Sequence, residues 1–409
     1  MNRPTRVVDV LVVGAGPAGL AAAARLAATG VGTVEVLERE RHPGGALRHC
    51  PRSGFALREP RQPVGGPALA RRLAGAAVAA GAVVRTGVTA TGWAGALTLD
   101  TTSPAGLERI TARAVVLATG ARERPRSARL VPGTRPAGVF TGGELQQAVY
   151  LYGQDVGTRA VVVGAEPVAR HAVRALGRAG AEVAALVTTE PWPRPGAFAP
   201  GRLVAPVPVL GRTEVTGLLG RGRLSGVRLR HAGGRETTVA CDTVVFTGDW
   251  IPEHELARHG GVVLDPGTRG PAVDAALRTS ATGVFAVGDV LHGGEGASRA
   301  ATEGRAVVAG VLAHLSGAAP WPGSRVAVVV DEPLRWVAPN LTGAVPGRFL
   351  VRAGRRLVRP VLVVAQDGVP LYRRRLPGTL TPSRSVSLPG AWVAGADPAG
   401  GPVRIGVGP

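Results

Sequence analysis

The alternation of apolar and polar positions at the start of the chain predicts a strand, a tight turn, a helix and a second strand. The same order of elements returns after residue 159. The expected elements are strand 7–13, helix 17–28 and strand 33–37, then strand 160–163, a helix through residue 176 and strand 181–187. Such β-α-β units are typical of nucleotide-binding folds, so the pattern predicts two of them in one chain.

The apolar runs between and after these units indicate how the two copies are connected. Two short buried strands, 115–117 and 243–246, are both followed closely by Thr-Gly. The run 284–290 and a small-residue helix at 297–315 then return the chain to the first copy. We therefore expect an α/β fold with two Rossmann-like dinucleotide-binding domains, the second inserted in the first. The expected domains are 1–150 with 250–316 for the first, and 151–249 for the second.

The end of the chain predicts a small β-rich domain, residues 325–409. A break rich in proline and glycine, including Pro320, Pro322 and Gly323, precedes it. Short strands are expected at 349–352, 360–365, 371–376 and 403–407, with a hairpin turn at Asp367-Gly368. No catalytic constellation is found in this part of the sequence.

The segment Gly14-Ala15-Gly16-Pro17-Ala18-Gly19 has the spacing of a dinucleotide-binding turn between a strand and a helix. The first glycine permits the tight bend, the second lets a pyrophosphate approach the backbone, and the third lets the helix pack on the strand. The helix N-terminus adds partial positive charge, which favours phosphate. Glu38 ends the second strand about 20 residues further on, where an acid accepts hydrogen bonds from ribose hydroxyls. These features predict a dinucleotide site without deciding between FAD and NAD.

The second copy has a degenerate glycine turn. Gly164 is kept, but Glu166 stands at the position of the second glycine and Ala169 at that of the third. A bulky anionic side chain there obstructs and repels a pyrophosphate. The following strand ends in Thr188 and Thr189 rather than in an acid. The fold is therefore expected to be retained, whereas NAD(P)H binding is left open, with Glu166 against it.

Composition and charge exclude several classes of protein. The chain has 409 residues, which allows two or three domains, and its 48 basic and 28 acidic residues give a formal net charge of +20. Every basic residue is arginine. No nucleic-acid partner is expected, because no reading motif accompanies the charge and aromatic residues make up only 4%. No apolar stretch reaches the ~18 to 20 residues that span a bilayer, so no transmembrane segment is expected.

Two cysteines, Cys50 and Cys241, are too few for a disulfide scaffold or a four-thiolate metal site, and no metal is expected. A reducing cytoplasm is the simplest setting. Cys50 has no partner two to five residues away, so disulfide reduction is not expected either. Cys241 opens a strand and is interpreted as structural.

Three further stretches resemble the flavin fingerprints of the pyridine nucleotide-disulfide oxidoreductase superfamily. They are PGGALRHC at 43–50, ATG at 118–120 and VFAVGDV at 284–290. The resemblance implies FAD as the cofactor, with Asp289 on its ribityl chain. Together with the first glycine turn it assigns to the cofactor Gly14, Gly16, Pro17, Ala18, Gly19, Glu38, Arg39, Gly45, Ala46, Leu47, Val88, Ala118, Thr119, Gly120, Gly288 and Asp289.

Within the superfamily, longer stretches are similar to the FAD-dependent oxidoreductases associated with glycerol-3-phosphate dehydrogenase. That subgroup is related to flavoprotein subunits of opine, proline and hydrogen-cyanide-forming amino acid oxidases. The stretches are PGTRPAGVFTGGELQQ (132–147), IPEHEL (251–256), DPGTRGPAVD (265–274) and LRTSATGVFAVGDVLH (277–292). The similarity extends from residue 7 to about 316 and leaves out the C-terminal tail.

Two side chains are candidates for a catalytic role. Cys50 follows the glycines of the flavin fingerprint closely, although a lone cysteine is also typical of packing. His292 follows Asp289, so it is expected either near the flavin edge or a substrate, or on a surface loop. Arg122, Glu123 and Arg124, after the ATG turn, are expected either to contact a cofactor phosphate or to pair with one another across a solvated loop.

The function that these observations favour is an electron-transferring flavoprotein component of a multi-subunit dehydrogenase or oxidase. Its substrate is expected to be glycerol 3-phosphate, an amino acid or a similar small molecule, and its partner a redox subunit. Two alternatives remain. One is a free-standing NAD(P)H-dependent reductase that passes electrons to a quinone, a ferredoxin or a small acceptor. The other is a flavin-bound scaffold that docks a partner through its arginine-rich tail. A hetero-oligomer or a homodimer is expected.

Overall fold

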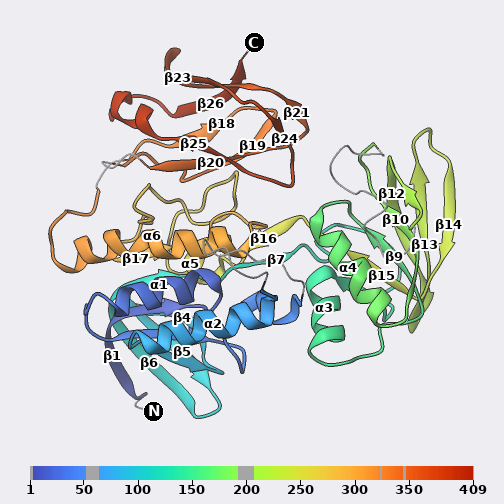
Figure 1. The fold of residues 1–409 in the computed structure, drawn as a ribbon, viewed down its shortest axis with the longest axis horizontal. Helices are drawn as coiled ribbons and strands as arrows, with labels where there is room; N and C mark the ends of the chain where they lie inside the picture. Colours follow the sequence, from blue (N-terminus) through green and yellow to red (C-terminus); the bar gives the residue numbers. More distant parts are fainter. Residues whose placement is uncertain (1–2, 52–63, 192–206, 323–324, 344–346, 409) are drawn as a thin grey trace. The chain divides into compact units, whose positions relative to one another are not determined.

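In the computed structural model the described residues are 3–51, 64–191, 207–322, 325–343 and 347–408 (Figure 1). Their contacts divide the chain into two units. The first unit contains the residues up to Leu47, residues 64–121 and the residues from Pro252 onward. The second unit contains residues 48–51 and Arg122–Ile251. The first unit is therefore discontinuous in the sequence.

The first unit is built on a sheet that has seven strands among the described residues. The strand order is β3 (Val83–Thr86), β2 (Val34–Glu38), β1 (Thr5–Val13), β6 (Gly106–Leu117), β5 (Thr98–Ser103) and β4 (Thr89–Gly95), with β17 (Val284–Ala286) paired to β6. Strand β1 is parallel to both of its neighbours. Its residues Val10, Leu11 and Val12 are fully buried, as expected of a parallel sheet covered on both faces.

Three helices pack together beside this sheet (Figure 1). Helix α1 (Pro17–Ala27) contacts both α2 (Gly66–Ala79) and α6 (Ala297–Leu315). A Cβ atom on Gly304 of α6 would lie 2.0 Å from the carbonyl oxygen of Ala18. Glycine at 304 therefore lets α6 approach the start of α1, where the first glycine turn ends. The short helix α5 (Glu255–His259) contacts β4.

The second unit repeats the parallel arrangement. Its main sheet has the order β11 (Val209–Leu210), β10 (Glu182–Val187), β9 (Arg159–Val163), β15 (Thr243–Phe246) and β8 (Val139–Thr141). Helices α3 (Gly142–Tyr150) and α4 (Pro167–Arg178) pack on each other. An antiparallel sheet of β12 (Thr213–Arg221), β13 (Arg223–His231) and β14 (Glu236–Ala240) follows. β8 and α3 precede residue 150 but belong to this unit, because β8 pairs with β15.

Strands β7 (Ala121–Glu123) and β16 (Trp250–Pro252) pair with each other where the chain leaves the first unit and returns to it. In this division by contacts the second unit resumes at Arg122. The α/β architecture with two Rossmann-like parallel sheets, which the sequence predicts, is confirmed.

The C-terminal part is β-rich, as predicted. One sheet has the order β18 (Val328–Val330), β26 (Val403–Gly408), β22 (Val361–Gln366) and β23 (Val369–Arg375). A second sheet has the order β19 (Leu334–Ala338), β20 (Arg348–Ala353) and β25 (Val386–Pro389). A third sheet pairs β21 (Leu357–Val358) with β24 (Thr379–Leu380). Phe349 packs on Trp392, with ring centroids 4.6 Å apart, in the core of these strands. Asp367 and Gly368 both have positive φ, which the predicted hairpin turn requires.

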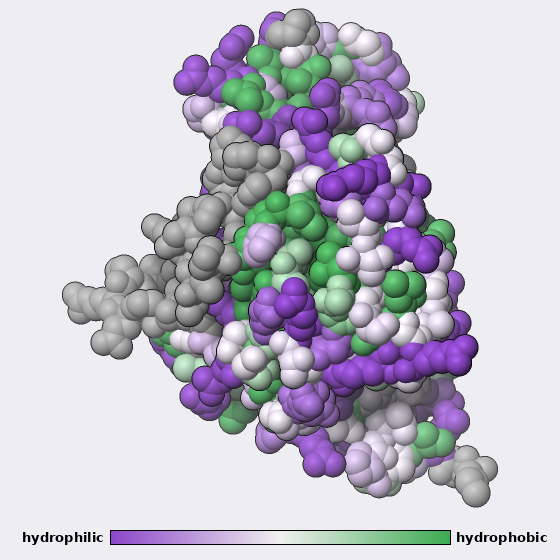
Figure 2. Space-filling view, turned by 90° about the vertical axis from the view of Figure 1, so that its right-hand side faces the viewer, coloured by the Kyte–Doolittle hydropathy of each residue, from purple (hydrophilic) through white to green (hydrophobic). Residues whose placement is uncertain are grey.

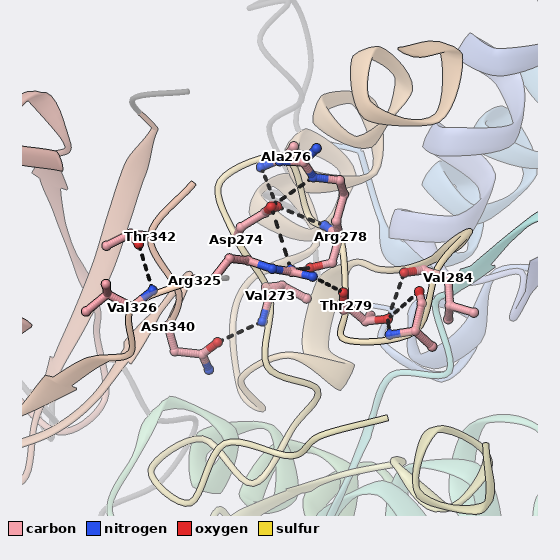
Figure 3. A network of polar contacts seen from close by, with 11 residues as sticks. Val273, Asp274, Ala276, Arg278, Thr279, Val284, Arg325, Val326, Asn340 and Thr342 are labelled. Carbon is pink, nitrogen blue, oxygen red and sulfur yellow. Dashed lines mark hydrogen bonds and ion pairs between the residues drawn. The ribbon is translucent and has the colours of Figure 1, made fainter. Parts of the chain in front are cut away.

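A buried polar network attaches these strands to the rest of the first unit (Figure 3). Asp274 is fully buried, and its carboxylate accepts hydrogen bonds from the Arg278 guanidinium at 2.8 Å and from two backbone N–H groups. The Arg325 guanidinium lies 3.7 Å from Asp274 and donates to the carbonyl oxygens of Arg278 and Thr279. These donors offset the cost of burying the Asp274 charge. Because Arg325 takes part in the network, the network also holds the start of the C-terminal strands in place.

Arginine side chains at the surface pair with carboxylates of the same chain. Examples are Arg159 with Glu182 at 2.8 Å and Arg124 with Asp249 at 3.1 Å. Figure 2 shows one face of the molecule, where apolar side chains gather in patches among hydrophilic ones. Within the described ranges, no helix combines the length and the apolar character that crossing a membrane requires.

Candidate functional site

The first glycine turn has the geometry that its three glycines predict. Gly14 has a φ of +106°, and a Cβ atom there would lie 2.3 Å from the carbonyl oxygen of Ala118. A Cβ atom on Gly19 would lie 1.9 Å from the carbonyl oxygen of Gly14. A Cβ atom on Gly16, in contrast, would meet no atom of the described residues within 4 Å. The outer glycines are therefore needed for close packing, whereas the middle one faces open space.

Helix α1 begins directly after its N-cap residue Gly16, which supplies no side-chain hydrogen bond to the helix N–H groups, and Pro17 lies in its first turn. No acidic residue lies in that turn. The uncapped N–H groups and the helix dipole favour an anion at this point. The open space beside Gly16 is thus suited to the pyrophosphate of a dinucleotide.

Glu38 lies at the end of β2 beside this turn and is only 6% exposed. Its Oε2 accepts a hydrogen bond from the Ala15 N–H at 3.1 Å, and its Oε1 accepts one from the Glu40 N–H at 3.0 Å. Burial raises the pKa of Glu38 above its ordinary value. Each carboxylate oxygen can accept a second hydrogen bond, so ribose hydroxyls can still bind.

The other residues assigned to the first site from the sequence surround the same turn. A Cβ atom on Gly45 would lie 3.2 Å from the Cα of Gly16, and the N–H of Gly44 donates to the Ala15 carbonyl oxygen at 2.7 Å. The N–H of Val88 donates to the Glu38 carbonyl oxygen at 3.0 Å. The remaining members are the buried Ala18, Leu47 and Ala118, the exposed Arg39 and Ala46, and Thr119 and Gly120, which both bond to the backbone of Glu253.

Asp289 lies in the short helix η3 (Gly288–Val290), which packs on the start of α1. A Cβ atom on Gly288 would lie 2.7 Å from the Cβ of Ala18. The Asp289 Oδ1 atom is buried and has no hydrogen-bond partner among the described residues. Burial raises the pKa of Asp289 to about 7. A buried acceptor without a donor is costly, so this oxygen is suited to a hydroxyl group of a bound ligand.

His292 is buried, with 1% of its surface exposed, so the surface-loop alternative is wrong. Its Nε2 lies 3.0 Å from Oε1 of Glu303, whose Oε2 accepts the Gly288 N–H at 3.1 Å. Burial lowers the pKa of His292, but the carboxyl groups of Glu303, Asp289 and Glu295 together outweigh this effect and raise the pKa to about 9. The imidazole is therefore protonated at neutral pH. Glu303 has no motif that would have revealed it in the sequence.

The two cysteines have different surroundings. Cys241 is 4% exposed, and burial raises the pKa of its thiol to about 11, which fits a structural role. Cys50 is partly exposed and groups with the second unit, and its role stays a prediction. No cluster of metal-ligating side chains occurs among the described residues.

The second glycine turn is filled by a side chain of the chain itself. The Glu166 carboxylate folds back over the turn, where Oε2 accepts the Ala165 N–H at 2.7 Å and Oε1 accepts the Thr247 hydroxyl at 2.8 Å. A Cβ atom on Gly164 would lie 2.7 Å from Oε1 of Glu166, and one on Gly248 would lie 2.1 Å from it. The carboxylate therefore lies between these two glycines.

A second carboxylate, that of Glu123, is buried nearby and not on a solvated loop. Its Oε2 accepts the Gly143 N–H at 2.6 Å, in the first turn of α3, and its Oε1 accepts the Gly248 N–H at 3.0 Å. Burial raises the pKa of Glu123 to about 7, against the effect of these two donors and with a contribution from Glu166. The Arg129 guanidinium donates to the Gly248 carbonyl oxygen at 2.7 Å. Sequence reasoning missed this role of Glu123.

These contacts decide whether the second turn fits a pyrophosphate. Three backbone N–H groups, those of Ala165, Gly143 and Gly248, already donate to carboxylates. Two unit charges 4 Å apart repel each other by about 4 kcal/mol at an effective dielectric constant of about 20. The Glu166 carboxylate would repel a phosphate that enters this turn, and the phosphate would find no free donor among these three N–H groups. The residues of the second turn, Ala169 included as a fully buried packing residue, do not fit the pyrophosphate of NAD(P)H.

Comparison with known proteins agrees with the fold and with the first site. The family model described as pyridine nucleotide-disulphide oxidoreductase matches residues 8–304. The chain belongs to this family. The likeness stated from the sequence fingerprints is thereby confirmed. Proteins of this family are flavin-dependent oxidoreductases that bind FAD and use NAD(P)H, so the first turn fits the family's cofactor and the second departs from the family.

Subunits of two oxidases are similar to this chain. An opine oxidase subunit of Agrobacterium tumefaciens (strain Ach5) is 32% identical over 335 residues, which cover 75% of this chain and 66% of the relative. The alpha subunit of the sarcosine oxidase of Corynebacterium sp. (strain P-1) is 30% identical over 369 residues, which cover 82% of this chain and 36% of the relative. This member of the family thus spans just under two thirds of the first relative and about a third of the second.

A solved structure shares the fold. The thioredoxin reductase of T. acidophilum superposes with a TM-score of 0.61, covering 76% of this chain and 99% of the reductase, at 24% sequence identity. At this identity the likeness concerns the fold alone. The shared part leaves out about a quarter of this family member.

Proposed function

We propose that this chain is the FAD-carrying subunit of a multi-subunit dehydrogenase or oxidase and receives electrons from a partner subunit. The observation that carries the proposal is the position of the Glu166 carboxylate in the second glycine turn. Because that carboxylate takes the place of a nicotinamide dinucleotide's pyrophosphate, NAD(P)H is not the reductant. The electrons then come from a substrate oxidised elsewhere in the complex.

The first unit supplies the groups that FAD requires. The open space at Gly16 and the uncapped start of α1 accept the pyrophosphate, and Glu38 accepts the adenosine ribose hydroxyls. Asp289 Oδ1, buried without a partner among the described residues, accepts a ribityl hydroxyl. When bound, FAD supplies the redox chemistry, whereas the protein holds it, orients it and limits its contact with water.

The two similar relatives support a subunit role. Both are named as oxidase subunits, one acting on opines and the other on sarcosine. Opines and sarcosine are amino acids substituted on nitrogen. An amino acid of this kind is therefore favoured over glycerol 3-phosphate as the substrate of the complex.

A disulfide-reductase function is not supported. The two cysteines lie far apart in sequence, at positions 50 and 241. A dithiol that cycles with a disulfide needs two thiols within bonding reach. Cys241 is also buried, with a raised thiol pKa that disfavours the reactive thiolate.

The test is anaerobic mixing of the FAD-loaded protein with NADH, with NADPH and, separately, with dithionite, while the flavin absorbance is recorded. We expect dithionite to bleach the flavin band and neither nucleotide to do so within seconds. Rapid bleaching by NADH or NADPH would make the chain a nicotinamide-dependent reductase and would overturn the proposal. A purified chain that takes up no FAD would overturn it as well.

A further inference from the structure

The segment 288–295, which carries Asp289, is held by two side chains from the C-terminal strands. Trp336 of β19 stacks on His292, with ring centroids 5.2 Å apart and an interplanar angle of 13°. Arg352 of β20 lies over the Trp336 ring, with its Cζ 4.8 Å from the ring centroid. Trp336 and Arg352 are 5% and 6% exposed, so both contacts are buried.

Arg352 also forms hydrogen bonds with the backbone of this segment. Its guanidinium donates to the carbonyl oxygens of Gly293 at 3.2 Å and Gly294 at 3.3 Å, and it pairs with the Glu295 carboxylate. The Glu295 backbone N–H in turn donates to the Asp289 carboxyl group. A continuous line of contacts therefore runs from Arg352 on β20 through Glu295 to the carboxyl group of Asp289, whose Oδ1 has no partner among the described residues.

The conformation of segment 288–295 depends on the contact with Arg352, because acidic side chains gather around the segment. Asp289, Glu295 and Glu303 are acidic, and the cations that face them are His292, Arg299 and Arg352. Glycines at 293 and 294 make the backbone permissive, and Gly294 has a φ of +85°. Without Arg352, Glu295 would lose a buried partner and the glycine backbone two hydrogen bonds. Other conformations of the segment would then compete with the one that aims Asp289 at a ligand.

We propose that the C-terminal β region is part of the cofactor site, and that Trp336 and Arg352 are positioning residues that hold Asp289 in place for the FAD ribityl chain. The proposal rests on the proposed FAD site. It adds that FAD affinity depends on side chains that lie beyond the residues matched by the family model, 8–304. Neither residue needs to touch the cofactor for this effect.

The test compares FAD dissociation constants of the full-length apoprotein and its variants, measured by quenching of flavin fluorescence. Arg352→Met and Trp336→Ala should each bind FAD about tenfold more weakly or worse, because a buried charge-assisted contact is lost. Arg352→Lys and Trp336→Phe should recover part of the affinity. Arg404→Met is the matched arginine control, because Arg404 lies on β26 with its side chain 58% exposed and pairs with Asp331.

A second control separates positioning from general loss of stability. Leu362→Ala removes a fully buried side chain from the core of the same strands without touching segment 288–295. It should lower the melting temperature at least as much as Arg352→Met while FAD affinity stays within about twofold of the wild-type value. If Leu362→Ala weakens FAD binding as much as Arg352→Met, or if no variant weakens it, the positioning role is overturned. Failure of the wild-type chain itself to bind FAD would instead refute the proposed function.

Discussion

The Glu166 carboxylate accepts a hydrogen bond from the Thr247 hydroxyl at 2.8 Å, and this contact fills the second glycine turn. In the first turn the corresponding residue is Gly16, whose Cβ position meets no described atom within 4 Å. One residue type at one position thus distinguishes an open dinucleotide turn from a filled one. The buried Glu123 adds to the difference between the two turns, because its carboxylate accepts hydrogen bonds from the N–H groups of Gly143 and Gly248.

Removing these carboxylates should create a nucleotide site. We expect Glu166→Gly to introduce weak NADH or NADPH binding, and Glu166→Gly with Glu123→Gln to tighten it further, because backbone donors are freed and like charge is removed. Nucleotide fluorescence titration measures the effect. Glu182→Gln, a charge change on the surface of the same unit, is the control and should bind no nucleotide. If the double variant binds none either, something other than these carboxylates closes the turn.

Filling the open space of the first turn should abolish FAD binding. Gly16 has a φ of −76°, which valine adopts readily, so Gly16→Val is expected to fold and to lose the flavin. The measurement is the ratio of flavin to protein absorbance after purification, with circular dichroism as the check of folding. Gly75→Ala is the control, because Gly75 lies inside α2 and, in the part of the chain that the structure describes, no atom lies within 4 Å of its Cβ position. A Gly16→Val variant with normal flavin content would refute the assignment.

Asp289 is expected to lower the stability of the folded apoprotein, although it favours FAD binding. Because burial raises its pKa to about 7, the folded apoprotein holds a proton that the unfolded chain loses near pH 4. Stability of the apoprotein should therefore fall as pH rises from about 4 to 7. Asp289→Asn should reduce this slope and raise the melting temperature at pH 7.5, while it weakens FAD binding. Thermal unfolding of the apoprotein across this pH range checks the first part, and the FAD dissociation constant checks the second.

The pKa of His292 should depend on Glu303 first. Glu303 is the largest of the charges that raise this pKa to about 9, so Glu303→Gln should lower it strongly, whereas Glu295→Gln should lower it less. Proton NMR titration of the imidazole in the apoprotein measures both. Since the folded pKa is above the unfolded value of about 6.5, stabilisation by the imidazolium is complete below pH 6.5 and is lost as pH rises through 9. A His292 that titrates near pH 6.5 in the wild type would contradict this arrangement.

The sequence by itself determined the local features of the molecule. The strand-turn-helix at Gly14, Gly16 and Gly19 follows from apolar periodicity and glycine spacing, which act over a few residues. Glu38 follows from its distance to the turn, and the misfit of Glu166 from its size and charge alone. The Asp367-Gly368 hairpin is equally local, since both residues take the positive φ that their types favour.

Only the tertiary structure decided how buried charges are compensated. Glu123 accepts the N–H of Gly248, 125 positions away, and Arg352 pairs with Glu295, 57 positions away. Periodicity cannot reveal such pairs, because it reports which face of a strand or helix is buried and not which polar group lies opposite. His292 is buried because Trp336 of a distant strand covers it, and its charge is fixed by Glu303 on α6. The chain's local pattern therefore sets the two glycine turns, whereas long-range packing sets the electrostatic surroundings of each.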